Sequence, residues 1–510
     1  MTDLLAQKKA IHESSWEPAY QFFSRVVEEY NFKKGAEIGV AFGGHSEAIL
    51  SQTRVEKLYG VDSYQHRSGY EDPMNLPQSD FDTLYERAKE RLGVFGERFE
   101  LIRAASKDAI ERIEGELDFI YIDADHSYQG VWDDLCTWFA KVRMGGIIGG
   151  HDYDHPYFPG VRQAIDEFFR RFDWQIHTEG EGVWWVEKQP LNVSFFIPAF
   201  NCALTLTEAV ESIMEGNFSE GDELVIVNDC STDATAAVLE ELQRRYPALR
   251  VFRHSRNKGG AAARNTAIEN TTNQILFCLD SDNILAPGSI PKLKDFLITS
   301  GADVASFQEL HYFKQSKDEV TEKWTFRTGA IGLADFLSNH KVPGASGNYM
   351  FTKESWTRAG GYPEFAGALD AWGFGLRQVA TGSKLMVMPD SFYHHRHGHE
   401  SYWCRDARDG KIPVAGLQIL LPFMDLLVDE DVEYVMSREG RKSWQANIER
   451  RPLRLKKEAG GNFRDNASQQ QPSLKKMLKR LVSQNLSPNG QRVVKNVKKR
   501  LRPVFNRSGS

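Results

Sequence analysis

The chain has 510 residues, of which 41% are hydrophobic, 12% aromatic and 26% charged, and its formal net charge is −7. These proportions are ordinary for globular proteins, and they exclude a collagen-like, low-complexity or wholly disordered chain. The length exceeds what a single hydrophobic core usually accommodates, so we expect more than one domain. The best candidate for a membrane span, at 417–428, contains Pro422 and Asp425 and is too short to cross a bilayer.

Five cysteines lie far apart in the sequence: Cys136, Cys202, Cys230, Cys278 and Cys404. Their spacing fits neither a disulfide framework nor a metal site, which is typical of proteins in a reducing compartment. No signal peptide precedes the first predicted domain. We therefore expect a cytoplasmic protein.

A glycine-rich loop stands near the start of the chain. A predicted helix at 18–30 leads into GAEIGVAFGGHS at 35–46, a strand that breaks into glycines before a predicted helix at 47–51. Glycines at such a break allow the backbone to approach a ligand closely. On its own, the pattern fits a dinucleotide, S-adenosylmethionine or a tight turn.

The same loop resembles the cofactor loop of class I methyltransferases, which begins with an acidic residue and continues with spaced glycines. Here that pattern gives Glu37, Gly39 and Gly43, and Asp62 ends the following strand. Further on, LDFIYIDADHSY resembles small-molecule O-methyltransferases that act on sugars and macrolide glycosides. The resemblance covers about residues 16–187 and implies a Rossmann-like domain. Glu37, Gly39 and Gly43 would bind S-adenosylmethionine, and Asp62 its ribose.

Some of these relatives hold a divalent cation that positions the sugar diol. The resemblance implies Asp123 and Asp152 as its ligands and Asp125 as the base, with His126 and His151 nearby. Carboxylates from two strand ends, beside a third that accepts a proton, suit metal-assisted O-methylation. One alternative is that the acidic residues at 123 and 125 only cap the next helix and order the cofactor pocket. Another is a non-catalytic cofactor-binding or scaffolding domain. His151 stands where metal-dependent relatives commonly carry an acid.

From position 192 onward, short apolar strands alternate with helices. We predict strands at 193–197, 223–227, 250–253 and 274–279, and helices that begin near 205, 234 and 261. This alternation predicts a parallel sheet, whose ligands bind at the carboxyl ends of the strands. The last strand ends at Asp280-Ser281-Asp282, where two carboxylates one residue apart can hold a divalent cation beside a diphosphate. The alternative is an ordinary acidic surface loop.

Four segments of this region resemble, in order and spacing, the nucleotide-binding half of inverting family 2 glycosyltransferases of the GT-A fold: VSFFIPAFN, ELVIVNDCSTD, NKGGAAARN and FCLDSDN. The resemblance implies a nucleotide-sugar donor. It places Pro198, Ala199 and Phe200 along the base and ribose. It also places Asp229 at the uracil–ribose end and Arg264 near the diphosphate.

In the same resemblance, Asp280 and Asp282 hold Mg²⁺ or Mn²⁺, Asp280 also contacts the donor, and Asp282 is the more direct metal ligand. The family usually has Asp and Gly where this chain has Asn228 and Cys230. Asparagine keeps hydrogen-bonding capacity, whereas Cys230 costs the turn some flexibility.

The following half resembles the acceptor part of the same family, where an acidic motif at a helix start supplies the general base. The family pattern E-D-x-E-F-G-x-R, laid over 370–377, puts Asp370 on the Glu and Ala371 on the Asp. We therefore expect Asp370 to be the base, with Glu364 as the alternative. An aspartate at this position is also a good helix cap.

Four histidines, His394, His395, His397 and His399, follow an apolar run at 385–388. In the resembling enzymes one histidine hereabouts completes the metal shell, and we expect His397 or His395 in that role. A separate zinc site is the alternative, but no cysteine spacing accompanies the cluster.

Two sequence patterns meet at 187–190. We expect a methyltransferase domain at 1–188, a glycosyltransferase domain at 189–440 and a basic tail at 441–510, with so short a joint that the two domains pack together.

The tail from residue 451 carries sixteen Lys and Arg against two acidic residues. Segments 473–482 and 493–504 alternate basic and apolar residues at helical spacing, which predicts amphipathic contact with an anionic membrane surface. A disordered, solvated tail is the alternative. Nucleic-acid binding is disfavoured because aromatic residues are nearly absent.

The sequence as a whole predicts a bifunctional transferase of glycan assembly, cytoplasmic or peripheral at the inner face of the membrane. One domain would transfer a sugar from a nucleotide sugar to a glycan or glycolipid, and the other would methylate a sugar hydroxyl. The alternatives are a glycosyltransferase with a non-catalytic first domain, and a lectin-like protein with an inactive transferase fold.

Overall fold

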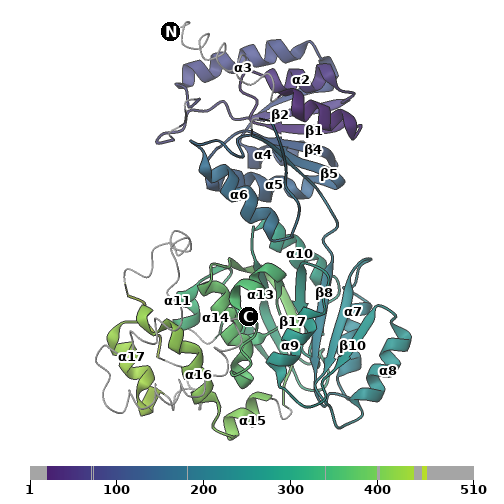
Figure 1. The fold of residues 1–510 in the computed structure, drawn as a ribbon, viewed down its shortest axis with the longest axis vertical. Helices are drawn as coiled ribbons and strands as arrows, with labels where there is room; N and C mark the ends of the chain where they lie inside the picture. Colours follow the sequence, from purple (N-terminus) through teal and green to yellow (C-terminus); the bar gives the residue numbers. More distant parts are fainter. Residues whose placement is uncertain are drawn as a thin grey trace.

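The computed structural model describes residues 20–70, 72, 74–180, 182–338, 341–398, 402–440 and 451–456. It contains two α/β domains, drawn one above the other in Figure 1, each built on its own sheet. The predicted fold class of two doubly wound α/β domains is confirmed. The predicted amphipathic segments at 473–482 and 493–504 lie outside the described residues. Among the described helices, none is both long and apolar enough to cross a membrane.

The first domain holds a seven-stranded sheet in the order β3-β2-β1-β4-β5-β7-β6. Its strands are β1 (Lys34–Ile38), β2 (Lys57–Asp62), β3 (Phe99–Arg103), β4 (Leu117–Ile122), β5 (Val142–Gly150), β6 (His177–Glu179) and β7 (Val183–Glu187). Strands β1 to β5 are parallel, and β7 runs antiparallel to β5. The strand order reverses between β1 and β4, which is where ligands of such sheets bind.

Helices cover both faces of this sheet. They are α2 (Gly44–Gln52), α3 (Gln78–Gly93), α4 (Ser106–Ala109), α5 (Tyr128–Trp138) and α6 (Pro159–Arg170), with 3₁₀ turns η1 (Gly96–Arg98), η2 (Ile110–Arg112) and η3 (Phe139–Lys141). Helix α6 buries positions 161, 164, 165, 168 and 169, an apolar stripe at helical spacing. One hydrophobic core contains residues of α4, α5 and α6, and a second, on the opposite face, contains those of α2 and α3.

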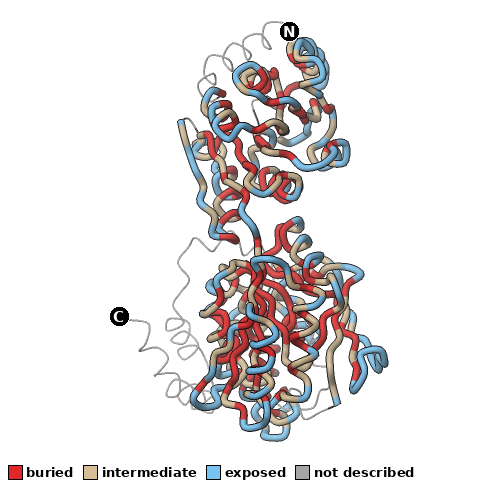
Figure 2. The backbone as a smooth tube through the Cα atoms, turned by 90° about the vertical axis from the view of Figure 1, so that its right-hand side faces the viewer, coloured by how far each residue is buried: buried red, intermediate tan, exposed pale blue. Residues whose placement is uncertain are grey.

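The second domain holds a ten-stranded sheet whose main path is β10-β9-β8-β11-β16-β13-β17-β12. Its strands are β8 (Val193–Ala199), β9 (Glu223–Asn228), β10 (Leu249–Arg253), β11 (Ile275–Cys278), β12 (Ile284–Leu285), β13 (Val304–Phe313), β14 (Glu322–Thr325), β15 (Gly329–Ile331), β16 (Met350–Thr352) and β17 (Leu385–Arg396). The first four strands of the path are parallel. Their apolar runs are buried, as central parallel strands require, and Figure 2 shows these buried segments in the middle of the domain.

The helices of this domain are α7 (Leu206–Met214), α8 (Thr235–Arg245), α9 (Gly260–Glu269), α10 (Ser289–Thr299), α11 (Leu333–Ser338), α12 (Pro343–Ser346), α13 (Lys353–Ala359), α14 (Asp370–Ala380), α15 (Tyr402–Arg408), α16 (Ile412–Leu420) and α17 (Asp429–Met436), with 3₁₀ turns η4 (Gly367–Leu369) and η5 (Leu421–Leu426). The apolar run at 385–388 forms only the first part of a longer strand. Strand β17 continues to Arg396 because it pairs with the equally long β13. His394 and His395 therefore lie within a strand rather than after one.

The two domains contact each other where α5 and η3 meet α10. The Arg171 guanidinium is buried there, with its carbon 4.9 Å from the ring centre of Phe168, and it donates to the carbonyl of Leu297 at 3.3 Å. Gly301 has φ +63, and a Cβ on it would lie 2.3 Å from Nε1 of Trp132. The short joint predicted domains that pack together, and these contacts join them.

Candidate functional sites

The glycine-rich loop between β1 and α2 passes close to the end of β4. Gly39 has φ +95, and a Cβ on it would lie 1.9 Å from the carbonyl oxygen of Asp123. Gly43 has φ +78 and occupies the N-cap position of α2. Because both positions require glycine, the loop presents bare backbone beside a helix N-terminus. This arrangement fits the S-adenosylmethionine that the loop pattern implies.

Glu37 lies behind this loop and is only 2% exposed. One carboxylate oxygen lies 3.1 Å from Nδ1 of His45, and the other accepts a hydrogen bond from the hydroxyl of Ser46. These contacts fasten the first turn of α2 to β1. Glu37 therefore holds the shape of the loop through other side chains.

Asp62 ends β2 and supports the same loop from the other side. Its Oδ2 accepts the backbone N–H groups of Val40 and Ala41, both at 3.0 Å, and its Oδ1 accepts that of Tyr64 at 2.8 Å. Burial raises the pKa of Asp62 despite these three hydrogen bonds. A carboxylate offers about four acceptor positions, so one is left for a hydroxyl such as that of a ribose.

Three residues at the ends of β4 and β5 form a candidate metal centre. The ligand atoms of Asp123, His126 and Asp152 all lie within 4.8 Å of one another. Nε2 of His126 is 3.3 Å from Asp123 Oδ1 and 3.0 Å from Asp152 Oδ2. Two carboxylates and an imidazole suit a divalent cation such as Mg²⁺ or Mn²⁺. The sequence predicted Asp123 and Asp152 as ligands, and the structure brings them together with His126.

The imidazole of His126 lies among three carboxylates, those of Asp72, Asp123 and Asp152. Burial lowers its pKa, but Asp123, Asp152 and Asp72 outweigh this effect and raise the pKa well above its usual range. Burial likewise raises the pKa of Asp152, and hydrogen bonds from His126 and His151 more than reverse this and lower it. Asp152 also has φ +62, a left-handed conformation that is strained for a non-glycine residue.

Asp125, the predicted base of this site, points to other partners. Its Oδ2 accepts from Arg67 at 2.6 Å, and its Oδ1 accepts the N–H of Ser127 at 2.9 Å. Burial raises its pKa, but these hydrogen bonds prevail and the pKa is lowered. A carboxylate with a lowered pKa is a weak base near neutral pH.

In the second domain, Asp229 follows β9 and braces the loop that enters α9. Its carboxylate accepts the N–H groups of Lys258 at 2.8 Å and Gly259 at 2.7 Å, and lies 2.6 Å from Nδ1 of His254. Asp229 is only 2% exposed. The next residue, Cys230, has φ +61. The family pattern favours glycine there because this backbone region strains other residues.

Arg264 on α9 joins two predicted site residues that lie far apart in the sequence. Its Nη1 donates to Asp370 Oδ2 and its Nη2 donates to Asp280 Oδ1, each at 2.7 Å. Burial raises the pKa of Asp370, while Arg264 opposes this shift. Asp280 also accepts from Nδ2 of Asn348 at 3.0 Å. A Cβ on Gly260 would lie 2.9 Å from Arg264 Nη1, so a larger residue here would press on this pair.

The rest of the Asp-Ser-Asp loop is held by the end of β17. The carbonyl of Asp282 accepts from Nε of Arg396 at 3.1 Å, and Oδ1 of Asn283 accepts the Arg396 N–H at 2.9 Å. Nδ1 of His395 lies 3.3 Å from Nδ2 of Asn283, beside this loop. Nε2 of His397, in contrast, lies 2.7 Å from the hydroxyl of Thr321.

The predicted ligand set of Asp280, Asp282 and His397 is thus not brought together. Across the described part of the chain, the first-domain group is the only set of three acidic, histidine or cysteine residues whose ligand atoms lie close enough for a metal ion. His399 lies outside the described residues. Two carboxylates still fit Mg²⁺ or Mn²⁺, since such ions usually complete their coordination with substrate phosphates and water.

Pro198 and Phe200 lie at the end of β8, and both are half-buried. Glu364, the alternative base, is exposed and accepts only a long hydrogen bond, 3.4 Å, from Asn265.

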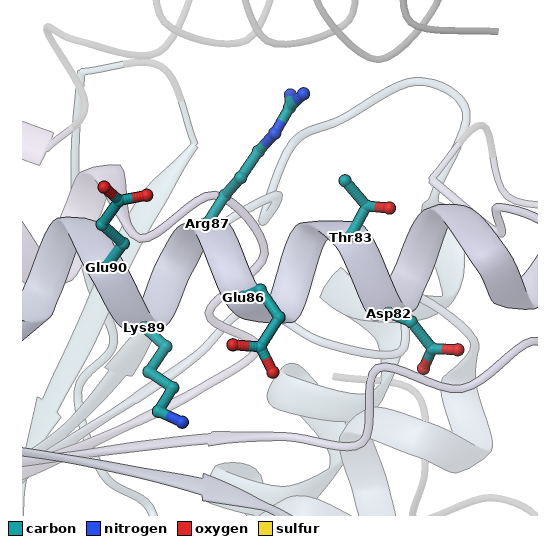
Figure 3. Close-up of a pocket in the computed structure, with 6 residues that line it drawn as sticks. All are labelled: Asp82, Thr83, Glu86, Arg87, Lys89 and Glu90. Atoms are coloured by element: carbon teal, nitrogen blue, oxygen red, sulfur yellow. The ribbon is translucent and has the colours of Figure 1, made fainter.

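A separate hollow runs along α3 and is lined by the side chains labelled in Figure 3: Asp82, Thr83, Glu86, Arg87, Lys89 and Glu90. None of these is a predicted site residue. The hollow is therefore separate from the two candidate sites.

Sequence reasoning missed several partners of these sites. The sequence placed His126 near the first-domain site but not among its ligands, and the structure adds it to Asp123 and Asp152. Asp72 lies 2.8 Å from Nδ1 of His126, and Asn348 contacts Asp280, but both come from distant loops without a motif. Only the folded chain shows their roles.

The geometry thus defines two α/β sites, a glycine-loop site and an acidic strand-end site. Residues 36–153 match the family model of a methyltransferase domain, and residues 194–360 match that of glycosyl transferase family 2. The chain therefore resembles a methyltransferase domain joined to a family 2 glycosyltransferase domain.

Two curated relatives match within the second domain. The succinoglycan biosynthesis protein ExoO of Rhizobium meliloti is 33% identical over 122 residues, which is 24% of this chain and 33% of the relative. The chondroitin synthase of Escherichia coli is 35% identical over 130 residues, which is 26% of this chain and 18% of the relative. The chain thus spans a third or less of the length of these relatives. The solved structure of S. aureus TarS 1-349 is similar at 17% identity and a TM-score of 0.39, covering 50% of this chain and 72% of that one.

Proposed function

We propose that the second domain transfers a sugar from a nucleotide sugar to a hydroxyl of a glycan or glycolipid, with inversion at the anomeric carbon. The observation that carries this proposal is the double pairing of Arg264 with Asp280 and Asp370. Through this pairing, one guanidinium holds the carboxylate at the end of β11 close to the carboxylate that is the base candidate. The match to glycosyl transferase family 2 supports the reaction class. The names of the relatives, a succinoglycan biosynthesis protein and a chondroitin synthase, support a glycan acceptor.

In an inverting transfer, the acceptor oxygen bonds to the anomeric carbon as the bond to the diphosphate oxygen breaks. The hydroxyl proton passes to a carboxylate, and the nucleoside diphosphate leaves. Asp370 suits the proton acceptor because burial raises its pKa and so its basicity. Asp280 and Asp282 would hold Mg²⁺ or Mn²⁺, which when bound stabilises the charge of the departing diphosphate.

The test of these roles is a screen of nucleotide sugars for metal-dependent hydrolysis and transfer, followed by Asp370→Asn. We expect donor affinity near that of the parent and transfer lower by about 10²–10⁴-fold. Glu364→Gln, at an exposed position, serves as the matched control and should keep full transfer. Full turnover in Asp370→Asn would move the base to Glu364 or elsewhere.

We infer that the first domain binds S-adenosylmethionine and methylates a sugar hydroxyl. The glycine loop, the remaining acceptor capacity of Asp62 and the match to a methyltransferase domain support this function. Asp123, His126 and Asp152 would hold a divalent cation, which when bound orients and acidifies a hydroxyl.

Calorimetric titration with S-adenosylmethionine tests binding directly. We expect heat of binding in the parent and much weaker binding in Asp62→Ala. Absence of heat in the parent would end the cofactor assignment. Binding without transfer of a labelled methyl group to any glycan acceptor would favour the non-catalytic alternative.

A further inference from the structure

Helix α15 is fixed beside the start of α14. Asp406 on this helix is buried, and its Oδ2 accepts the N–H of Ala368 at 2.9 Å. Ala368 belongs to η4, which immediately precedes Asp370. Nζ of Lys411, just beyond the helix, lies 3.3 Å from the other oxygen of Asp406. These contacts give the neighbouring side chains of α15 a defined place near the base candidate.

Arg405 on this helix carries a guanidinium that faces two rings. Its guanidinium carbon lies 5.8 Å from the ring centre of Phe200 and 5.7 Å from that of Tyr402. Within the described residues, the guanidinium has no hydrogen bond or ion pair, and its Nε is buried. The rings attract the cation but leave its five N–H donors unused. Because Arg405 is half-buried and only its Nε is enclosed, its remaining donors are free to bind acceptor atoms of a ligand.

The surroundings of Arg405 belong to the donor site. Phe200 is predicted to line the base and ribose. Cε1 of Tyr402 lies 3.8 Å from the Cβ position of Gly260, whose other neighbours are Arg264 at 2.9 Å and Asp370 at 3.2 Å. Arg405 therefore contacts both Phe200, at the predicted nucleoside-binding end of the site, and Tyr402, which borders the Arg264–Asp370 pair.

The charge balance of the site calls for a further cation. The carboxylates of Asp280 and Asp370 share the cation of Arg264, and Asp282 adds a third negative charge. The guanidinium of Arg396, which contacts the carbonyl of Asp282, pairs with Glu208. A diphosphate entering this site meets net negative charge, and a divalent cation would only offset it. A guanidinium that pairs with no carboxylate of the described residues adds attraction for the diphosphate, since guanidinium–phosphate hydrogen bonds are charge-assisted.

We propose that Arg405 binds the diphosphate oxygens of the nucleotide-sugar donor, a role that none of the four donor motifs assigns. The inference rests on the proposed function of the second domain.

The role of Arg405 is tested by calorimetric titration of the full chain with UDP and with uridine, both in the presence of Mn²⁺. Arg405→Gln should weaken UDP binding by about tenfold or more, because it removes a hydrogen bond to a charged group. Uridine, which lacks phosphate, should bind Arg405→Gln as it binds the parent.

Two further variants sharpen the test. Arg408→Gln removes an exposed arginine from the same helix and should bind UDP as the parent does. Arg405→Lys keeps the charge but loses the planar fork, so UDP binding should fall by less than in Arg405→Gln. Circular dichroism checks the fold of each variant. Should Arg405→Gln fail to fold, the reduced UDP affinity of Arg405→Lys, with uridine binding unchanged, carries the test.

The outcomes separate the inference from the function on which it rests. UDP affinity in Arg405→Gln equal to that of the parent would overturn the inference and leave the proposed function intact. An equal loss for UDP and uridine would also overturn it, because the guanidinium would then stack on the base. A parent protein that binds none of UDP, ADP, GDP, CDP and dTDP would overturn the proposed function together with the inference.

Discussion

Replacing Arg264 by glutamine should strongly destabilise the second domain. The substitution removes the cation that lies 2.7 Å from each of two carboxylates, those of Asp280 and Asp370. Breaking a buried ion pair by removing one partner costs about 3–5 kcal/mol. Asp280 keeps its hydrogen bond from Asn348, and Asp370 keeps that from the N–H of Ala371. We therefore expect a loss near the lower limit, about 3 kcal/mol in the free energy of unfolding.

Asp370→Asn is the matched substitution, and it should leave stability unchanged or higher. Arg264 keeps Asp280 as its partner, so the charges of the pair balance. Burial raises the pKa of Asp370, which means that the folded protein binds this proton more tightly than the unfolded chain does. Ionisation of Asp370 therefore costs stability as the pH rises through the folded pKa, and asparagine avoids that cost.

Urea unfolding at neutral pH, followed by circular dichroism, measures both effects. The Arg264→Gln protein should also regain part of its stability as the pH falls, because its two unpaired carboxylates can then take up protons. A loss below about 1 kcal/mol in Arg264→Gln, or an equal loss in Asp370→Asn, would refute the view that Arg264 balances two buried charges.

Three other predictions concern stability and surface binding. Burial raises the pKa of Asp134 from 3.8 to about 7, so stability should fall as the pH rises between these values, by at most about 1.4 kcal/mol per pH unit. Asp134→Asn, which can still accept from Ser106, should flatten this slope in a pH series of unfolding curves, and an unchanged slope would contradict the assignment. Cys230→Gly should raise the free energy of unfolding by up to about 1 kcal/mol, and with it the thermal midpoint, because it relieves the left-handed backbone at φ +61. A lower midpoint would argue against strain there. A chain ending at Arg450 should float less with anionic vesicles than the full chain, and equal flotation would remove the predicted membrane contact of the tail.

The fold could be predicted because strand and helix patterns are local. Alternating apolar strands and helices from position 192 were enough for a parallel sheet, and the glycines at 39 and 43 marked the turn into a helix. Strand β17 was underestimated, because its polar end from Asp390 to Arg396 has no apolar run and is strand only through pairing with β13.

The contents of the sites were harder to predict, because they depend on contacts between distant segments. Arg264 is predicted near the diphosphate, but its pairing with Asp370 joins residues 106 positions apart, and no spacing rule indicates it. The choice between His395 and His397 depends on which partner each ring meets, since Asn283 and Thr321 come from other elements. Arg405 belongs to no motif, and its position becomes visible only through the rings of Phe200 and Tyr402.

We propose that the acidic end of β11 serves a nucleotide-sugar transferase. The most direct test measures Mn²⁺-dependent hydrolysis of nucleotide sugars by the full chain and by Asp282→Ala. We expect activity toward at least one donor in the parent and its loss in Asp282→Ala, with both proteins equally folded. Full activity in Asp282→Ala would contradict the metal assignment, and inactivity of the parent toward every donor would contradict the claim itself.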